Sequence, residues 1–296
     1  MKKTVLITGI TGYISQYLLR HAPDTVRLMG STRREQAALK NKLWKIIRLN
    51  LTKDVAAQLD AAEVFPDVVL HTAALSGLGD CQRNPQLAER VNAQATAELA
   101  HWCQKHGVRL VYLSTDIVFK GDRPPYDEQE QPDPINVYGR SKWQGEQAIL
   151  KTGGDFAIGR IALALGRGLN GTHNFIDWFV QRLQSGQPVT LFTDEIRTAT
   201  YVGALAERFW QLALSAEQGI FHVCGSRAVD RFTLGRALCD YLGYGHDLLK
   251  PISLNDMNDY PRPADVSLLS TRTVDGQPFT IPSIMEYIPL LFGNEF

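Results

Sequence analysis

The chain has 296 residues, of which 44% are hydrophobic, so it can form one large domain or two modest ones with a sizeable core. Lys and Arg together number 31, as do Asp and Glu, and this balance argues against nucleic acid or a membrane surface as the partner. No apolar run approaches membrane-spanning length, and the apolar segment after Met1-Lys2-Lys3 stops at Gly9. We therefore expect a soluble cytoplasmic protein that binds a small molecule.

The four cysteines are widely separated in the sequence. They form no C-x-x-C pair and have no histidine arrangement typical of zinc, so we predict no metal site. Reduced, structural thiols are the simplest interpretation, and they also indicate the cytosol. The residues are Cys81, Cys103, Cys224 and Cys239.

A short apolar strand at Thr4 to Thr8 runs directly into G-I-T-G-Y-I-S, residues 9–15, and then into a helix to about His21. Glycines at such a junction allow a tight turn and a close approach of backbone N–H groups to a pyrophosphate. Ser15 stands at the third glycine position, and its small side chain still permits helix-to-strand packing. Alone, the motif also fits an ordinary turn. The expected cofactor contacts are Gly9, Thr11, Gly12, Tyr13 and Ile14.

A second strand at Val26 to Gly30 is followed by Ser31-Thr32-Arg33-Arg34. An acidic residue here would hold the ribose 2′-hydroxyl of NAD, whereas arginine accommodates the 2′-phosphate of NADP. The basic residues predict NADP(H) as the preferred cofactor, with NAD(H) as the alternative. The candidate contacts are Ser31, Arg33 and Arg34.

Two further strands are predicted at Ile46 to Leu49 and at Asp67 to Leu70. An adenine ring could rest at the end of the first, and small residues after the second suit a close approach of the cofactor. His71 has no matching carboxylate nearby, so a structural role is the better interpretation. The candidate cofactor contacts in this part are Asn50, Leu51, Ala73 and Ala74.

Helices and strands alternate up to residue 160. Asn84-Pro85 is typical of a helix start, and Gly107 ends the same long helix. Strands follow at Val108 to Leu113 and Asp155 to Arg160. This alternation predicts an α/β fold with a Rossmann-type, doubly wound parallel sheet.

Ser114, Thr115 and Asp116 should emerge at the carboxyl end of the strand before them, where such sheets place their ligands. After a proline-rich connection, Tyr138 and Lys142 are one helical turn apart. A cation beside a tyrosine would favour its phenolate and lower its pKa from about 10. The pair could instead be a half-buried aromatic and a solvated lysine. The nearby Thr115 and the glycine-rich loop favour the functional interpretation.

The second half has no nucleotide-binding motif. We expect residues 1–165 to form the cofactor-binding domain and 166–296 a smaller C-terminal lobe that binds the substrate. The strand near Phe221 could return to the main sheet. The predicted elements are a helix from Phe175 to about Ser185, a strand at Val189 to Phe192, a helix from Val202 to Leu214, a strand at Ile220 to Val223 and a helix from Phe232 to Leu242.

Three motifs carry a family resemblance: T-G-I-T-G-Y-I-S at 8–15, S-T-D-I-V-F-K-G at 114–121 and Y-G-R-S-K at 138–142. With them the chain resembles the extended short-chain dehydrogenase/reductase family and, within it, the dTDP-4-dehydrorhamnose reductase-like branch. The resemblance implies that Tyr138 donates a proton to a sugar keto oxygen, that Lys142 lowers the pKa of the tyrosine and holds the nicotinamide ribose, and that Thr115 hydrogen-bonds the same oxygen. Ile117 replaces the acidic residue usual in related dehydratases, which argues against dehydration.

The substrate half differs more from the branch. Residues 160–166 read R-I-A-L-A-L-G in place of R-T-S-W-V-Y-G, and 194–200 read D-E-I-R-T-A-T in place of D-Q-x-G-x-P-T. The sugar is therefore left open. Arg197 could pair bidentately with a diphosphate or could equally be a surface arginine. The candidate substrate contacts are Thr115, Asp116, Asn174, Arg197 and Arg262.

These observations predict an NADPH-dependent reductase of a keto group on a nucleotide-activated deoxysugar. Two alternatives stay open. One is a nucleotide-sugar epimerase of the same family, in which hydride leaves and returns. The other is a non-catalytic NADP-binding regulatory subunit, because a partner protein of methionine adenosyltransferase is similar to this branch. A homodimer is possible.

Overall fold

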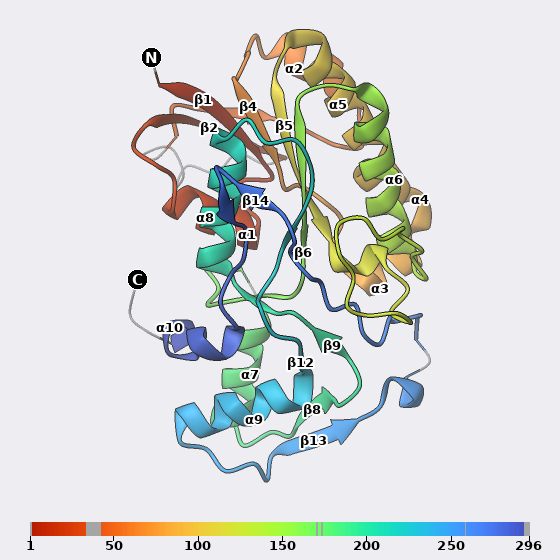
Figure 1. The fold of residues 1–296 in the computed structure, drawn as a ribbon, viewed down its shortest axis with the longest axis vertical. Coiled ribbons are helices and arrows are strands. Elements are labelled where there is room, and N and C mark those ends of the chain that lie inside the picture. Colours follow the sequence, from red (N-terminus) through yellow and green to blue (C-terminus); the bar gives the residue numbers. More distant parts are fainter. Residues whose placement is uncertain (1, 34–42, 170, 173, 258, 293–296) are drawn as a thin grey trace.

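The computed structural model describes residues 2–33, 43–169, 171–172, 174–257 and 259–292. A seven-stranded sheet lies at its centre, in the order β11-β6-β5-β4-β1-β2-β3, and every neighbouring pair is parallel (Figure 1). This confirms the predicted Rossmann-type sheet. The strands are β1 (Lys3–Thr8), β2 (Val26–Thr32), β3 (Lys45–Arg48), β4 (Val68–His71), β5 (Arg109–Thr115), β6 (Phe156–Ile161) and β11 (Gly219–Val223).

Helices cover both faces of the sheet because alternate side chains of each strand point to opposite faces. In β1, Val5 and Ile7 belong to one core cluster and Leu6 to another. The first cluster lies under α1 (Tyr13–Arg20) and α8 (Val202–Leu214), which pack together. The second lies under α2 (Val55–Ala61), α5 (Ala95–His106) and α6 (Val137–Thr152).

The long helix predicted from Pro85 to Gly107 is interrupted. It consists of α4 (Pro85–Glu89), a π-helical segment at Arg90–Gln94 and α5, and it ends at Gly107 with φ of 65°. A further short helix, α3 (Leu78–Arg83), precedes it. Asn92 lies in the π-helical segment and exchanges hydrogen bonds of 2.8 and 2.9 Å with the backbone of Leu75, which lines the cavity described below. The π-helical turn thus coincides with the position at which the Asn92 side chain bonds the loop at Leu75.

Most of the second half lies at the lower end of the molecule in Figure 1, below the carboxyl ends of the main strands. There β8 (Val189–Phe192) pairs in parallel with β13 (Leu249–Ile252), flanked by α7 (Phe175–Gln184) and α9 (Arg231–Leu242). The remaining short elements are β7 (Ala164–Leu165), β9 (Ile196–Arg197), β10 (Thr200–Tyr201), β12 (Val229–Asp230), β14 (Thr273–Val274), β15 (Gln277–Pro278), α10 (Ile288–Phe292) and the 3₁₀ helices at Asp116–Val118, Leu254–Asp256 and Ile284–Tyr287.

Two elements after residue 165 join the main sheet and its helical layer. Strand β11 pairs with β6, and the indole of Trp210 in α8 donates a hydrogen bond to the Leu18 carbonyl of α1 at 2.8 Å. One core cluster therefore contains residues from both halves. The division at residue 165 stays a prediction.

None of the helices in the described ranges combines the length and apolar character needed to cross a membrane. Within those same ranges, no group of three or more His, Cys, Asp or Glu side chains is placed to hold a metal ion. The four cysteines are buried and free.

Candidate active site

A cavity of about 1070 Å³ opens at the carboxyl ends of the central strands, and both halves of the chain line it. Of the residues proposed from the sequence, Arg34 lies outside the described residues. Asn174 does not line the cavity but begins α7, where its side-chain oxygen accepts from the Asp177 amide at 3.0 Å. Those that line it are Gly9, Thr11, Gly12, Tyr13, Ile14, Ser31, Arg33, Asn50, Leu51, Ala73, Ala74, Thr115, Asp116, Tyr138, Lys142, Arg197 and Arg262.

One end of the cavity has the form of a dinucleotide cradle. Gly9 adopts φ of +64°, and a Cβ there would lie 2.9 Å from the Cβ of Ala73. The Gly12 amide donates to the Gly9 carbonyl at 2.8 Å, which closes the turn before α1. Ser15, at the third glycine position, is buried and hydrogen-bonds the Thr72 hydroxyl at 2.7 Å, so it ties the helix to the end of β4. The tight turn and the helix N-terminus fit a pyrophosphate.

The end of β2 also lines the cavity, through Ser31, Thr32 and Arg33. Ser31 is buried and Arg33 is exposed, and no acidic side chain occurs in Ser31-Thr32-Arg33. Beside it, the Asn50 side-chain oxygen accepts from the Thr52 amide at 3.0 Å, which fixes the loop after β3. The hydroxyl and the guanidinium fit a 2′-phosphate better than a 2′-hydroxyl.

Tyr138 lines the same cavity from the first turn of α6. Asn136 begins that helix, and its side-chain oxygen accepts from the Gly139 amide at 2.8 Å. Burial raises the pKa of Tyr138 well above its ordinary value, the carboxylate of Asp116 raises it further, and a hydrogen bond with Thr115 opposes this. The expected lowering is thus wrong for this state of the protein. The phenol is fully protonated at neutral pH, as a proton donor must be.

Lys142 lines the cavity and is almost fully buried. Its Nζ donates to the Leu113 carbonyl at 2.7 Å and lies 4.0 Å from the centroid of the Tyr112 ring. Burial lowers the pKa of Lys142 to about 7, an effect that the Glu146 carboxylate opposes. The ammonium is therefore held by backbone and ring contacts, whereas the sequence suggested a solvated lysine as the alternative.

Thr115 and Asp116 extend the site from the end of β5. The Thr115 hydroxyl accepts from the Ile117 amide at 3.2 Å and donates to Asp116 Oδ1 at 3.1 Å. Burial raises the pKa of Asp116 to about 6, and the nearby Arg197 guanidinium opposes the shift. These contacts fix the hydroxyl beside Tyr138.

The C-terminal half of the chain contributes both predicted arginines to the cavity wall. Arg197 is only 4% exposed, so the surface interpretation is wrong. Arg262 donates from Nη2 to Asp259 at 3.0 Å and lies 4.0 Å from the centroid of the Tyr260 ring. Its Nε is buried and has no hydrogen-bond partner among the described residues. Arg262 therefore lines the cavity with one buried N–H that no described residue satisfies.

Several lining residues were not identified from the sequence. Glu195 accepts from Arg231 Nε at 2.7 Å, and both line the cavity. Phe175 and Trp178 of α7 add an aromatic wall. No motif or spacing in the sequence marks these residues, because they meet only through the fold of the lobe.

His71, which the sequence left outside the catalytic set, does not line the cavity. Its Nδ1 lies 2.8 Å from the Thr8 hydroxyl and its Nε2 lies 3.1 Å from the Thr96 hydroxyl. Burial, reinforced by the charge of Lys142, lowers its pKa to about 3. The ring is therefore a neutral structural link.

Comparison with known proteins agrees with this geometry. The family model described as RmlD substrate binding domain matches residues 1–286. The chain is 29% identical over 275 residues to the probable low-salt glycan biosynthesis reductase Agl14 of Haloferax volcanii, covering 92% of this chain and 91% of the relative. It is 31% identical over 278 residues to the dTDP-4-dehydrorhamnose reductase of Mycobacterium tuberculosis, covering 90% and 85%.

Among solved structures, dTDP-4-dehydrorhamnose reductase from Bacillus anthracis in complex with NADP superposes with a TM-score of 0.86 at 26% identity. The superposition covers 99% of each chain. The likeness therefore extends over both the cradle and the C-terminal lobe.

Proposed function

Because the chain belongs to the RmlD substrate binding domain family, a branch of the extended short-chain dehydrogenases/reductases, we propose that it is an NADPH-dependent reductase of a keto group on a nucleotide-activated deoxysugar. One observation carries the proposal. Tyr138, Thr115 and Lys142 line the same cavity as the glycine cradle at Gly9 and Gly12. A relative that acts on a dTDP-sugar and a structural relative bound to NADP support the substrate class and the cofactor.

Each part of the cavity has a distinct task in this proposal. The turn at Gly9 and Gly12 and the N-terminus of α1 hold the pyrophosphate of the cofactor, while Ser31 and Arg33 hold its 2′-phosphate. Ala73 and Leu51 border the adenosine side. Bound NADPH supplies the hydride for the carbonyl carbon.

The chain's own groups handle the proton. Tyr138 carries its proton at neutral pH because its pKa is raised, and its hydroxyl gives that proton to the keto oxygen. The Thr115 hydroxyl steadies the same oxygen as negative charge develops there. Lys142, when charged, stabilises the tyrosinate left after the transfer.

The nucleotide-sugar diphosphate lies, in this proposal, against the basic wall of the lobe. Arg262 offers a buried Nε without a partner among the described residues, and Arg231 lines the same cavity. Asn174, which begins α7, holds the helix that carries Phe175 and Trp178. Asp116 borders the sugar beside Thr115.

The test is the loss of NADPH absorbance when purified protein meets a panel of nucleotide-linked 4-keto-6-deoxysugars, with NADH in parallel. Oxidation with one sugar would establish the reductase and identify its substrate. Tight NADPH binding without oxidation by any sugar would contradict the proposal. An epimerase or a regulatory subunit would then be the better explanation.

Replacing Arg33 and Arg34 together by alanine is expected to raise the Kd for NADPH by about tenfold or more and to change the Kd for NADH much less, because charge-assisted contacts to the 2′-phosphate would be lost. Fluorescence titration with both cofactors measures this. Arg27→Ala is the matched control, since Arg27 is exposed at the opposite end of β2. Equal weakening of both cofactors would contradict a 2′-phosphate site.

We infer further that the protein is cytoplasmic, with residues 1–165 binding the cofactor and 166–296 the sugar. Free buried thiols support a reducing compartment. The homodimer is also a proposal, and sedimentation equilibrium with and without NADPH would test it.

A further inference from the structure

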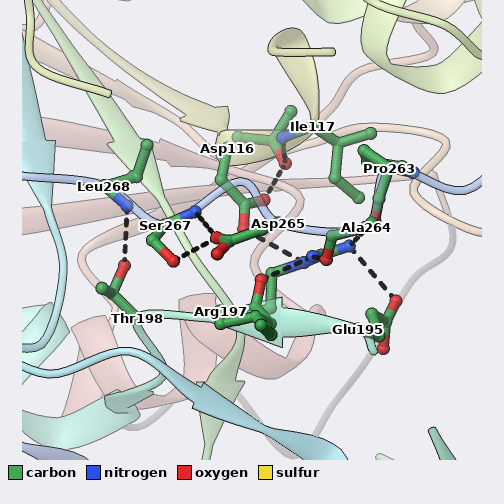
Figure 2. A network of polar contacts seen from close by, with 12 residues as sticks. Asp116, Ile117, Glu195, Arg197, Thr198, Pro263, Ala264, Asp265, Ser267 and Leu268 are labelled. Carbon is green, nitrogen blue, oxygen red and sulfur yellow. Dashed lines mark hydrogen bonds and ion pairs between the residues drawn. The ribbon is translucent and has the colours of Figure 1, made fainter. Parts of the chain in front are cut away.

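Arg197 is engaged on every side by the protein itself (Figure 2). Its Nη1 donates to the carbonyls of Ile196 at 2.7 Å and Ala264 at 3.1 Å. Its Nη2 donates to Glu195 Oε1 at 3.2 Å and to the Pro263 carbonyl at 3.1 Å. Its Nε lies 3.4 Å from Asp116 Oδ2. Four hydrogen bonds thus engage Nη1 and Nη2, and Nε is within ion-pair distance of Asp116, so most of the donor capacity of the guanidinium is directed at the protein itself.

These acceptors come from parts of the chain that are distant in sequence. Asp116 follows β5 directly, Glu195 and Ile196 lie at β9, and Pro263 and Ala264 belong to the segment after Arg262. A backbone hydrogen bond of 2.8 Å from the Ile196 amide to the Ala264 carbonyl adds to the junction. Arg197 therefore joins the catalytic end of β5 to the segment that carries Arg262.

Further hydrogen bonds hold the residues that follow Ala264. The Leu268 amide donates to the Thr198 hydroxyl at 3.1 Å, and the Ser267 amide donates to Asp265 Oδ1 at 2.9 Å (Figure 2). Residues 263–268 are consequently held by side chains and carbonyls rather than by a long strand ladder.

We propose that Arg197 is a positioning residue: it fixes the backbone at 263 and 264 against Asp116 so that Arg262 faces the cavity, and it does not contact the nucleotide sugar itself. The proposal rests on the proposed reductase function for its kinetic consequences only. The contacts by which Arg197 joins Asp116 to residues 263 and 264 do not depend on which reaction the protein catalyses.

The charges around Arg197 explain why an arginine is needed. Asp116 and Glu195 are both buried, and each interacts with the guanidinium. Glu195 also pairs with Arg231 at 2.7 Å, so the basic wall is tied to the same junction. A lysine would keep the positive charge, but its compact ammonium cannot reproduce a planar fork that reaches carboxylates and carbonyls at once. Arg197→Lys is therefore the informative variant.

Hydrogen exchange tests the link without any substrate. In the full chain saturated with NADPH, Arg197→Lys is expected to speed amide exchange by about tenfold in peptides covering 194–198 and 263–268, because the opening free energy of a local unit falls when its hydrogen bonds are lost. Peptides from β1 and α1 should be unchanged. The control is Arg123→Lys, whose side chain is 75% exposed. Unchanged exchange in 263–268 would overturn the proposal.

Kinetics distinguish positioning from direct contact. Arg197→Lys is expected to raise KM for the nucleotide sugar by about tenfold and to leave the Kd for NADPH within about twofold. If Arg197 acts through Arg262, the double variant with Arg262→Lys should be no worse than Arg262→Lys alone. Additive losses would identify Arg197 as an independent ligand and refute the proposal.

The two proposals fail in different ways. If no sugar is turned over by the wild type, the reductase is refuted and hydrogen exchange still decides the role of Arg197. If Arg197→Lys does not fold, Glu195→Gln replaces it, because this variant removes one charge from the junction at nearly constant shape. Glu195→Gln should speed amide exchange in residues 263–268 by a smaller factor than Arg197→Lys. If exchange there is not faster at all, the positioning role of Arg197 is contradicted.

Discussion

Replacing Tyr138 by phenylalanine is expected to lower kcat by about 10²–10⁴-fold, the range typical of a lost general acid. The substitution removes only the hydroxyl. Because the ring remains in its buried position, the Kd for NADPH should stay nearly unchanged. Single-turnover measurements with a nucleotide sugar and NADPH, together with fluorescence titration of NADPH, separate the two effects.

The matched control for this variant is Tyr112→Phe. Tyr112 is also a buried tyrosine, but it lies in β5 and does not line the cavity. Its hydroxyl donates a long hydrogen bond of 3.4 Å to the Asn92 carbonyl and interacts with Thr96, and the ring that faces Lys142 is kept in phenylalanine. This variant should keep most of the wild-type kcat. Preserved turnover in Tyr138→Phe would show that another group delivers the proton.

The central sheet could be predicted because its strands are buried on both faces and read as short apolar runs. Glycines or strand-end polar residues mark where several of them stop, as Gly9 does after β1. The C-terminal lobe gave weaker signals, since strands such as β9 and β12 have only two residues each. A strand of two residues is too short to show an alternating pattern in the sequence, and it forms only because a partner strand pairs with it.

The residues proposed to bind the cofactor could be identified in the sequence because they follow strand ends at short, fixed spacing. Most of the cavity wall that the C-terminal half contributes could not be identified in this way. Glu195, Arg231 and the carbonyl of Pro263 meet around Arg197 only when segments more than thirty residues apart come together. The direction of the Tyr138 pKa also escaped prediction, because helical spacing to Lys142 says nothing about burial or about the carboxylate of Asp116.

Replacing Gly139 by alanine is expected to lower kcat/KM by about 10²-fold, the loss that a displacement of the order of 1 Å can cause in a catalytic group. A Cβ at this position would lie 2.1 Å from the Ile117 carbonyl oxygen and 3.0 Å from the Cβ of Pro134. The first neighbour is backbone, so helix α6 must move away from the segment after β5. Tyr138 and Lys142 belong to this helix and would move with it.

This variant should differ from Tyr138→Phe in its binding as well as in its rate. Because Lys142 shifts together with Tyr138, the Kd for NADPH should rise along with the fall in kcat, whereas removal of the hydroxyl alone changes only kcat. Arg140→Ala is the control on the same helix, since Arg140 is exposed and should tolerate the change. Full activity of Gly139→Ala would mean that α6 can shift without moving the reacting hydroxyl. The close contact between α6 and Ile117 would then be a requirement of packing, and the glycine between Tyr138 and Lys142 would have no part in catalysis.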